Sequence, residues 1–159
     1  MADLKDVSFV MPVLNEQDYL AIAVESVLSQ KTPGKAQLVL ALGPSRDKTN
    51  QIAESLAKKY KNLILVENPT GSTATGLNLA IEKSSYETVI RVDAHSELSD
   101  NYAASAVKIL NTTGAANVGG MMIAKGRTAL QKAVAFGYNS RFGLGGGSFH
   151  VGGNPGPAD

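Results

Sequence analysis

Short apolar runs alternate with stretches of helical periodicity along this chain. The apolar runs predict strands at residues 7–13, 37–42, 62–67, 87–92 and 117–124. Between them, apolar residues recur every three or four positions, which predicts helices at 17–30, 47–60, 73–84, 100–111 and 128–138. The runs are apolar on both faces, as in parallel strands covered by helices on each side. The pattern therefore predicts an α/β fold, with a mostly parallel sheet between two helix layers and right-handed crossovers.

Polar residues gather where these strands end. Asn15 and Glu16 follow the first strand, residues 43–47 the second, residues 68–73 the third, and Asp93-Ala-His95 the fourth. Ligands of open α/β sheets bind beyond the carboxyl ends of the strands, so we expect the four loops to form one cleft. Taken singly, Asn15 and Asp47 are better explained as caps of the helices that follow them than as ligands.

The pair Asp93 and His95 is the most distinctive of these features. On an extended chain, residues two apart point to the same side. A carboxylate and an imidazole there can hold a divalent cation and, through it, a diphosphate. The alternative is that His95 only forms hydrogen bonds within its loop. The segment GSTATG lacks the lysine of a P-loop, and no GxGxxG follows the first strand, which argues against an NTPase and a dehydrogenase.

Composition narrows the function classes. The chain has 159 residues, of which 43% are hydrophobic and 18% charged, so we expect a globular domain. It contains no run of apolar residues long enough to span a membrane, and its N-terminus does not resemble a signal peptide. The lack of cysteine excludes disulfides and thiolate metal sites, and it fits a cytoplasmic protein.

Charge is spread unevenly along the chain. After Asp100 the only acidic residue is Asp159, whereas the basic residues there are Lys108, Lys125, Arg127, Lys132 and Arg141. Solvated helix faces explain this distribution, and so does a phosphate-bearing or membrane-surface partner near the C-terminal half. Basic residues are not interleaved with aromatic ones, so we expect no nucleic-acid partner.

Several segments, in order, carry a family resemblance. They are VSFVMPVLNEQDYLAIAVESVLSQ, GPSRDKTNQIA, TGSTATGLNLAI, RVDAHSEL and FHVGGNPGPAD. Together they resemble the family 2 glycosyltransferases of the GT-A fold, and within that family the ExoA-like branch of exopolysaccharide (succinoglycan) biosynthesis. The stretch VDAH lies where that family has its DXD motif, so we describe it as DXD-like.

The resemblance implies a role for individual residues. It implies a nucleotide-sugar site formed by Pro12, Val13, Asn15, Glu16, Gly43, Asp47, Gly71 and Asp93, and a metal site formed by Asp93 and His95. His95 replaces the second, metal-binding aspartate of the DXD motif. Leu42 or Gly43 stands where the family has an aspartate that reads the uracil edge, so we expect weaker discrimination between nucleotides.

The resemblance also implies an activity. We expect an inverting glycosyltransferase that uses Mn²⁺ or Mg²⁺ and transfers a sugar from a nucleoside-diphosphate sugar to a glycan or lipid-linked acceptor. Residues 1–142 are expected to form the donor-binding core and residues 143–159 a Gly-rich loop or tail. The family's catalytic base, acceptor side and membrane segments are expected beyond residue 159. The full-length protein is then expected at the inner face of the plasma membrane, and this chain alone is expected to transfer no sugar.

Two alternatives remain open from the residues themselves. A non-catalytic nucleotide-sugar-binding module would explain why we find no base. A nucleotidyltransferase shares a similar sheet, but it needs a Gly-rich loop with lysine or arginine after the first strand. That place here holds LNEQD, which argues against a nucleotidyltransferase.

Overall fold

The computed structural model describes residues 5–140 and Gly156. By its internal contacts the chain divides into two compact units, Met1–Asn117 and Val118–Asp159. This division falls before the boundary at residue 142 expected from the sequence. The expected Gly-rich tail, residues 143–159, lies outside the described residues except for Gly156.

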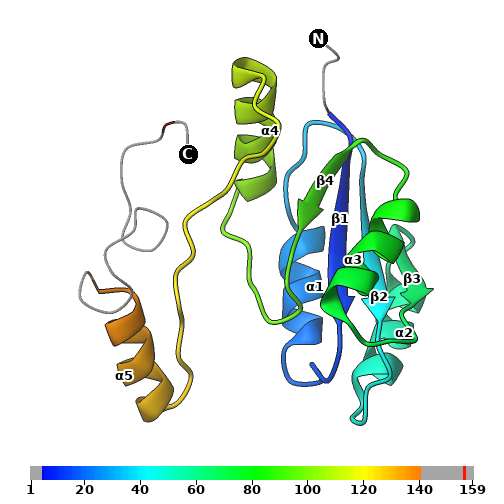
Figure 1. Ribbon diagram of the computed structural model, residues 1–159, viewed down its shortest axis with the longest axis vertical. Helices are drawn as coiled ribbons and strands as arrows, with labels where there is room; N and C mark the ends of the chain where they lie inside the picture. Colours follow the sequence, from blue (N-terminus) through cyan, green and yellow to red (C-terminus); the bar gives the residue numbers. More distant parts are fainter. Residues whose placement is uncertain (1–4, 141–155, 157–159) are drawn as a thin grey trace. The chain divides into compact units, whose positions relative to one another are not determined.

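The first unit is a four-stranded parallel sheet with helices between the strands. Its elements are β1 (Val7–Val13), α1 (Leu20–Leu28), β2 (Ala36–Leu42), α2 (Thr49–Lys59), β3 (Leu63–Glu67), α3 (Thr73–Glu82), β4 (Thr88–Arg91) and α4 (Tyr102–Thr113). The sheet order is β3-β2-β1-β4, and every neighbouring pair is parallel. Figure 1 shows the strand arrows pointing the same way. The predicted α/β fold is therefore confirmed.

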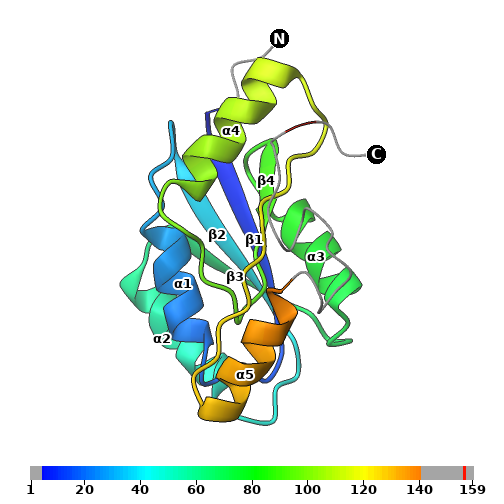
Figure 2. The ribbon, with the colours of Figure 1, turned by 90° about the vertical axis from the view of Figure 1, so that its left-hand side faces the viewer.

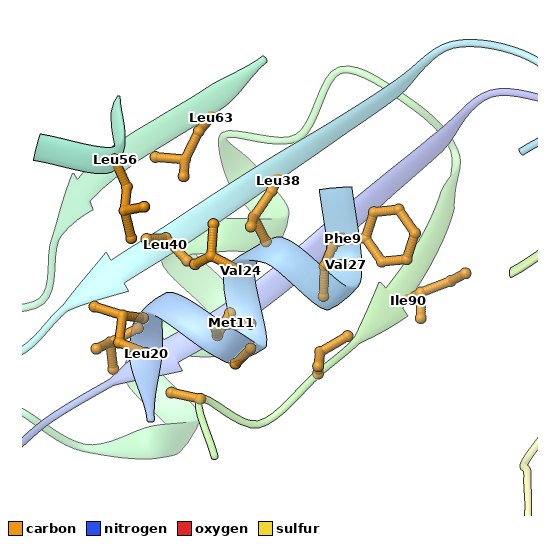
Figure 3. Close-up of a cluster of buried hydrophobic side chains, with 14 of the residues drawn as sticks. Phe9, Met11, Leu20, Val24, Val27, Leu38, Leu40, Leu56, Leu63 and Ile90 are labelled. Carbon is orange, nitrogen blue, oxygen red and sulfur yellow. The ribbon is translucent and has the colours of Figure 1, made fainter. Parts of the chain in front are cut away.

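Helices cover both faces of this sheet. Figure 2 shows α1 and α2 on one face and α3 on the other. The larger core cluster lies on the α1 side, where Phe9 and Met11 of β1 meet Val24 of α1 (Figure 3). The smaller one joins Val10 and Ala80 on the α3 side. Because β1 and β2 are covered twice, their sequences are apolar at nearly every position, as expected for buried parallel strands.

Strand β4 differs from the expectation of two buried faces. Thr88 and Ile90 are buried, whereas Val89 and Arg91 are exposed. In the described part of the chain β4 is the edge of the sheet, and α3 packs on β1, β2 and β3. The face of β4 that carries Val89 and Arg91 is therefore open beside α3. The residues that follow Arg91 lie next to the carboxyl end of β1.

The fifth strand predicted at residues 117–124 is wrong. These residues form no strand, and Met121, Met122 and Ile123 are all about half exposed. A strand forms only where it pairs with a neighbour and buries one side, and the described residues give this segment no pairing partner. The Gly119-Gly120 pair also lowers its strand propensity.

The second unit contains the predicted helix at its expected place, α5 (Ala129–Tyr138). A capping box starts it, because the Thr128 side chain accepts a hydrogen bond from the Gln131 amide while the Gln131 side chain accepts one from the Thr128 amide. At its end, the Asn139 side chain exchanges two hydrogen bonds with the backbone of Ala124, at 2.8 and 2.9 Å. Across the residues that the structure describes, no helix combines the length and apolar character needed to cross a membrane.

Candidate functional site

A cleft of about 280 Å³ lies at the carboxyl ends of the strands. Its lining comes from the ends of β1 and β4, from the loop after β3 and from the start of α3. The lining residues are Pro12, Val13, Leu14, Glu16, Asn68, Gly71, Thr73, Arg91, Asp93, Ala94 and His95. Another depression, of about 410 Å³, runs along the outer surface of α2 between Lys48 and Lys59. None of its lining residues carries a carboxylate or an imidazole, so the candidate metal-binding groups lie in the cleft at the strand ends.

The loops after β1 and β2 are joined by several hydrogen bonds into one structure, which we call the bracket (residues 15–17 and 45–49). The Asn15 amide donates to Ser45 Oγ at 3.0 Å, and Asn15 Oδ1 accepts from the Arg46 amide at 2.8 Å. The Gln17 side chain accepts from the Lys48 amide at 3.2 Å. Asn15 has a φ of 55°, a left-handed conformation that asparagine tolerates better than most residues. Side chains of each loop therefore satisfy backbone groups of the other.

Asp47 and Thr49 complete the bracket. Asp47 Oδ1 accepts hydrogen bonds from the Thr49 hydroxyl and from the Thr49 amide, and Oδ2 accepts from the Gln17 amide at 3.3 Å. The Thr49 hydroxyl lowers the pKa of Asp47, and the backbone donors of Thr49 and Gln17 lower it further. Thr49 Oγ1 also accepts from the Glu16 amide at 2.7 Å. Neither Asn15 nor Asp47 is the N-cap of its helix, since Tyr19 and Lys48 hold those positions without side-chain cap hydrogen bonds. Asp47 bonds to the first residue of α2, whereas Asn15 bonds to the facing loop.

Gly43 is required by close packing. A Cβ atom at this position would lie 2.9 Å from Leu14 Cδ1, 3.1 Å from Val13 O and 3.2 Å from Gly71 Cα. Gly71 has a φ of 66°, which favours glycine, and it turns the loop after β3 toward Pro44. Leu42, the other position considered for the missing aspartate, pairs with Val13 in the sheet. The three loops therefore approach one another at backbone distance around Gly43.

Residues 91–95, which we call the rim, form the opposite side of the cleft. Arg91 Nε and Nη2 both donate to Asp93 Oδ1, at 3.1 and 3.0 Å. Strand β4 ends at Arg91, and the Ser96 amide donates to Asp93 O, so the chain turns after Asp93. The argument that Asp93 and His95 share one side of an extended chain is therefore wrong in its geometry. Both residues nevertheless line the cleft.

His95 is linked to Glu16 across the cleft. Their Nδ1 and Oε1 atoms are 2.8 Å apart, and the Glu16 side chain is 20% exposed whereas that of His95 is 59% exposed. A carboxylate only accepts, so Nδ1 carries the proton and donates it. In the neutral ring, Nε2 then keeps its lone pair. Glu16 thus joins the two sides of the site, with its amide on the bracket and its carboxylate on the rim.

Asp93 and His95 are the cleft residues that could hold a cation together with ligands from outside the described residues. Asp93 Oδ2 and His95 Nε2 have no hydrogen-bond partner among the described residues, and a carboxylate on the second ring nitrogen is the usual support of a metal-binding histidine. Over the same residues, no group of three or more His, Asp or Glu could hold a metal ion alone. The set therefore suits a cation whose remaining ligands are phosphate oxygens and water, as Mg²⁺ commonly has.

The structure separates the predicted site residues into two groups. The cleft is lined by Pro12, Val13, Glu16, Gly71, Asp93 and His95, whereas Asn15, Gly43 and Asp47 belong to the bracket or its packing. Leu14, Arg91 and Ala94 also line the cleft but were not named as site residues, and Asn68 and Thr73 were expected there only as part of the loop 68–73. The sequence did contain an indication that Arg91 is not part of the core. A charged residue between the buried residues Ile90 and Val92 points to the opposite side of the strand.

Residues 8–144 match the family described as Glycosyl transferase family 2. The chain belongs to this family. The succinoglycan biosynthesis protein ExoA of Rhizobium meliloti is 33% identical over 145 residues, which are 90% of this chain and 44% of that protein. A poly(ribitol-phosphate) β-glucosyltransferase of Bacillus spizizenii is 28% identical over 102 residues, which are 62% of this chain and 15% of that protein. The chain thus spans less than half the length of these curated relatives.

Solved structures agree on the fold. The crystal structure of S. aureus TarS 1–349 in complex with UDP superposes with a TM-score of 0.61 at 20% identity, covering 75% of this chain and 39% of that one. The same fragment in complex with UDP-GlcNAc gives 0.59. At this identity the likeness shows the fold alone. The chain is therefore a GT-A-type domain of a family 2 glycosyltransferase, and its relatives include proteins of exopolysaccharide and teichoic acid biosynthesis.

Proposed function

We propose that this chain binds the donor for an inverting glycosyltransferase of polysaccharide biosynthesis. The donor is a nucleoside-diphosphate sugar, and the acceptor is a glycan or a lipid-linked glycan. The observation that carries the proposal is the cleft at the strand ends, where the DXD-like residues Asp93 and His95 face the loop of Pro12, Val13 and Glu16. The UDP and UDP-GlcNAc bound by TarS support a nucleotide-sugar donor.

In this proposal the two sides of the site have different tasks. The bracket fixes the loops that flank the nucleotide, and Asp93 and His95 of the rim bind the diphosphate through a metal ion. Asp93 and His95 would hold Mn²⁺ or Mg²⁺, which stabilises the charge that develops on the leaving nucleoside diphosphate. A nitrogen ligand shifts the preference toward Mn²⁺, because Mg²⁺ favours hard oxygen ligands.

Nucleotide selectivity should be weak for a family member. Gly43 offers no side chain to a base edge, and its surroundings leave no room for one. A lost hydrogen bond to the base leaves a donor unpaired, at about 1–3 kcal/mol. We therefore expect UDP to be favoured over GDP and ADP by a small factor.

The proposal assigns the general base of the inverting reaction to none of the bracket or rim residues. We expect residues 1–159 to bind the donor and to transfer no sugar, whereas slow hydrolysis of the donor is compatible with the proposal. Sustained glycosyl transfer by residues 1–159 alone would contradict it.

We also propose that the full-length protein works at the inner face of the plasma membrane. The support is the excess of basic residues after Asp100, together with Leu130, Val134 and Phe136, which are exposed on α5 near Lys132. Basic and exposed apolar side chains together favour an anionic membrane surface. Cosedimentation of the chain with anionic but not with neutral vesicles is the expected result, and equal binding to both would contradict the charge argument.

Donor binding is tested by calorimetry. UDP, GDP and ADP are titrated into the chain with Mn²⁺, with Mg²⁺ and with EDTA, while NMR amide shifts report where they bind. The proposal expects binding of at least one nucleoside diphosphate, and shift changes at Glu16, Gly71 and Asp93. Changes confined to the amino ends of the strands, around Lys61 and Glu87, would overturn it.

A further inference from the structure

Arg91 is a cleft residue that the proposed site does not use. It lines the cleft, and its side chain is 57% exposed. It lies on the open face of β4, opposite the buried Ile90 and Val92, so it contributes nothing to the main hydrophobic core. Its known contact is the pair of hydrogen bonds to Asp93 Oδ1, and Nη1 has no partner among the described residues.

The cleft and its proposed ligand both carry negative charge, so a positively charged group between them would favour binding. Glu16 and Asp93 each bring a carboxylate, and a nucleoside diphosphate brings at least two further negative charges. Among the described residues that line the cleft, Arg91 is the only lysine or arginine. With neither a metal ion nor Arg91, the diphosphate would face two carboxylates at close range with no opposite charge, which is strongly unfavourable.

The geometry of a guanidinium suits this task. Its planar edge binds two phosphate oxygens at once, and it stays charged at any working pH. Both donors that Arg91 uses now go to one oxygen of Asp93, which leaves the other oxygen for a cation. A phosphate could therefore be held by Arg91 beside Asp93 without displacing either group from the cleft.

We propose that Arg91 binds the diphosphate of the donor directly, so that donor binding is partly independent of a metal ion. This inference rests on the proposed function and adds a second cationic group to the same site. The metal ion and Arg91 then share the charge of the diphosphate, with Asp93 between them. Removing either one weakens binding, and removing both weakens it most.

The test compares Arg91→Met, which keeps length without charge, with Arg91→Lys, which keeps charge without the planar edge. Lys61→Met, at the exposed turn before β3, is the matched control for loss of one positive charge. UDP affinity is measured for each protein in EDTA and in Mn²⁺. Because Arg91 is exposed, the thermal midpoints of all four proteins should coincide.

In EDTA, Arg91→Met should lose roughly 10- to 100-fold in UDP affinity, since it removes a charge-assisted hydrogen bond. The loss should be smaller in Mn²⁺, intermediate for Arg91→Lys and absent for Lys61→Met. With uridine, which has no phosphate, Arg91→Met should bind as the wild type does.

Three results would overturn the inference. One is equal UDP affinity of wild type and Arg91→Met in EDTA. Another is an equal loss for UDP and uridine, which would make Arg91 a residue that only shapes the cleft. The third is wild-type binding of UDP in Mn²⁺ but not in EDTA, which rejects the role of Arg91 and leaves the proposed function standing. If the wild type binds no nucleoside diphosphate in any condition, the proposed function fails and the inference with it.

Discussion

The bracket and the rim lie on two sides of one cleft, and they are built in opposite ways. In the bracket, the side chains of Asn15, Gln17 and Asp47 bond to backbone groups of the facing loop, so each loop fixes the other. In the rim, Arg91, Asp93 and His95 are about half exposed, and their side chains bond to other side chains of the cleft instead of to backbone groups. Exposed pairs of this kind contribute about 1 kcal/mol or less to stability.

The difference separates the residues that hold the shape of the site from those that bind a ligand. A pre-organised loop loses little entropy when a ligand arrives, whereas an exposed ion pair can be rearranged around it. Substitutions in the bracket should therefore change stability first, and substitutions in the rim should change binding first. The predictions below start with the largest expected effect.

Asp93→Asn should break the rim without harming the fold. We expect Mn²⁺-dependent affinity for UDP to fall by roughly 10- to 100-fold, because a charged ligand is replaced by a neutral amide. The free energy of unfolding should change by less than about 0.5 kcal/mol, as for other exposed positions. Calorimetry and urea unfolding measure the two effects. A loss of stability that accounts for the loss of binding would place Asp93 with the scaffold instead.

Gly43→Asp should break the packing behind the bracket. The new side chain enters space held by Leu14 and Gly71, and overpacking of this kind costs about 1–3 kcal/mol. The control is Gly119→Asp, because an added Cβ there meets no atom within 4 Å. Urea unfolding should show a loss for the first variant and almost none for the second. Equal stability of Gly43→Asp and wild type would mean that the three loops are loosely packed.

Glu16 tests the comparison further, because its backbone amide belongs to the bracket and its carboxylate contacts His95 of the rim. Glu16→Ala should weaken Mn²⁺ binding about tenfold in the presence of UDP, as is typical when the support of a metal-binding histidine is lost. Glu16→Gln should lose less, because its amide oxygen still accepts from His95 Nδ1. Glu82→Ala, at the exposed end of α3, is the control. If Glu16→Ala has the same effect in a His95→Ala background, the two residues are not coupled.

The smallest effect concerns Asp47 and pH. Its pKa is lowered in the folded protein, so its hydrogen bonds stabilise the fold above the unfolded pKa of about 3.9. This contribution is lost as the pH falls through the lower folded pKa. Asp47→Asn should therefore be less stable than wild type at pH 7, and the difference should shrink as the pH falls through the lowered pKa of Asp47. Thr49→Val should reduce the pH dependence, whereas Thr49→Ser, which keeps the hydroxyl, should preserve it.

The sequence predicted the fold well, and physical reasons explain where it failed. Doubly buried strands such as β1 and β2 carry an apolar residue at almost every position, so their pattern is clear. Residues 117–124 are as apolar, but whether such a run pairs depends on a neighbouring strand that local sequence does not reveal. For the same reason β4 was predicted as a buried strand, although its Val89 and Arg91 lie on an open face.

The sequence predicted the position of the site better than it predicted the contacts within the site. The convergence of strand ends follows from parallel topology alone, so Glu16, Asp93 and His95 were expected near one another. Their contacts were not, because the turn after Asp93 and the distance from Glu16 to His95 depend on three-dimensional packing. Asn15 and Asp47 illustrate a second limit: a polar side chain at a strand end binds a ligand or the next loop, and the sequence is the same in both cases.

Thr49 shows how a residue outside the cleft could affect the use of a metal ion. Its hydroxyl holds the Glu16 amide, and the Glu16 carboxylate holds His95, so a buried residue in the first turn of α2 is two contacts away from the candidate cation ligand. If variants were selected for activity with a different metal ion, a substitution at Thr49 could alter the metal preference although no residue that lines the cleft had changed. Such a variant would look like a neutral change outside the site in a sequence comparison. Only the hydrogen bonds that join Thr49 to Glu16 and Glu16 to His95 would explain the change in metal preference.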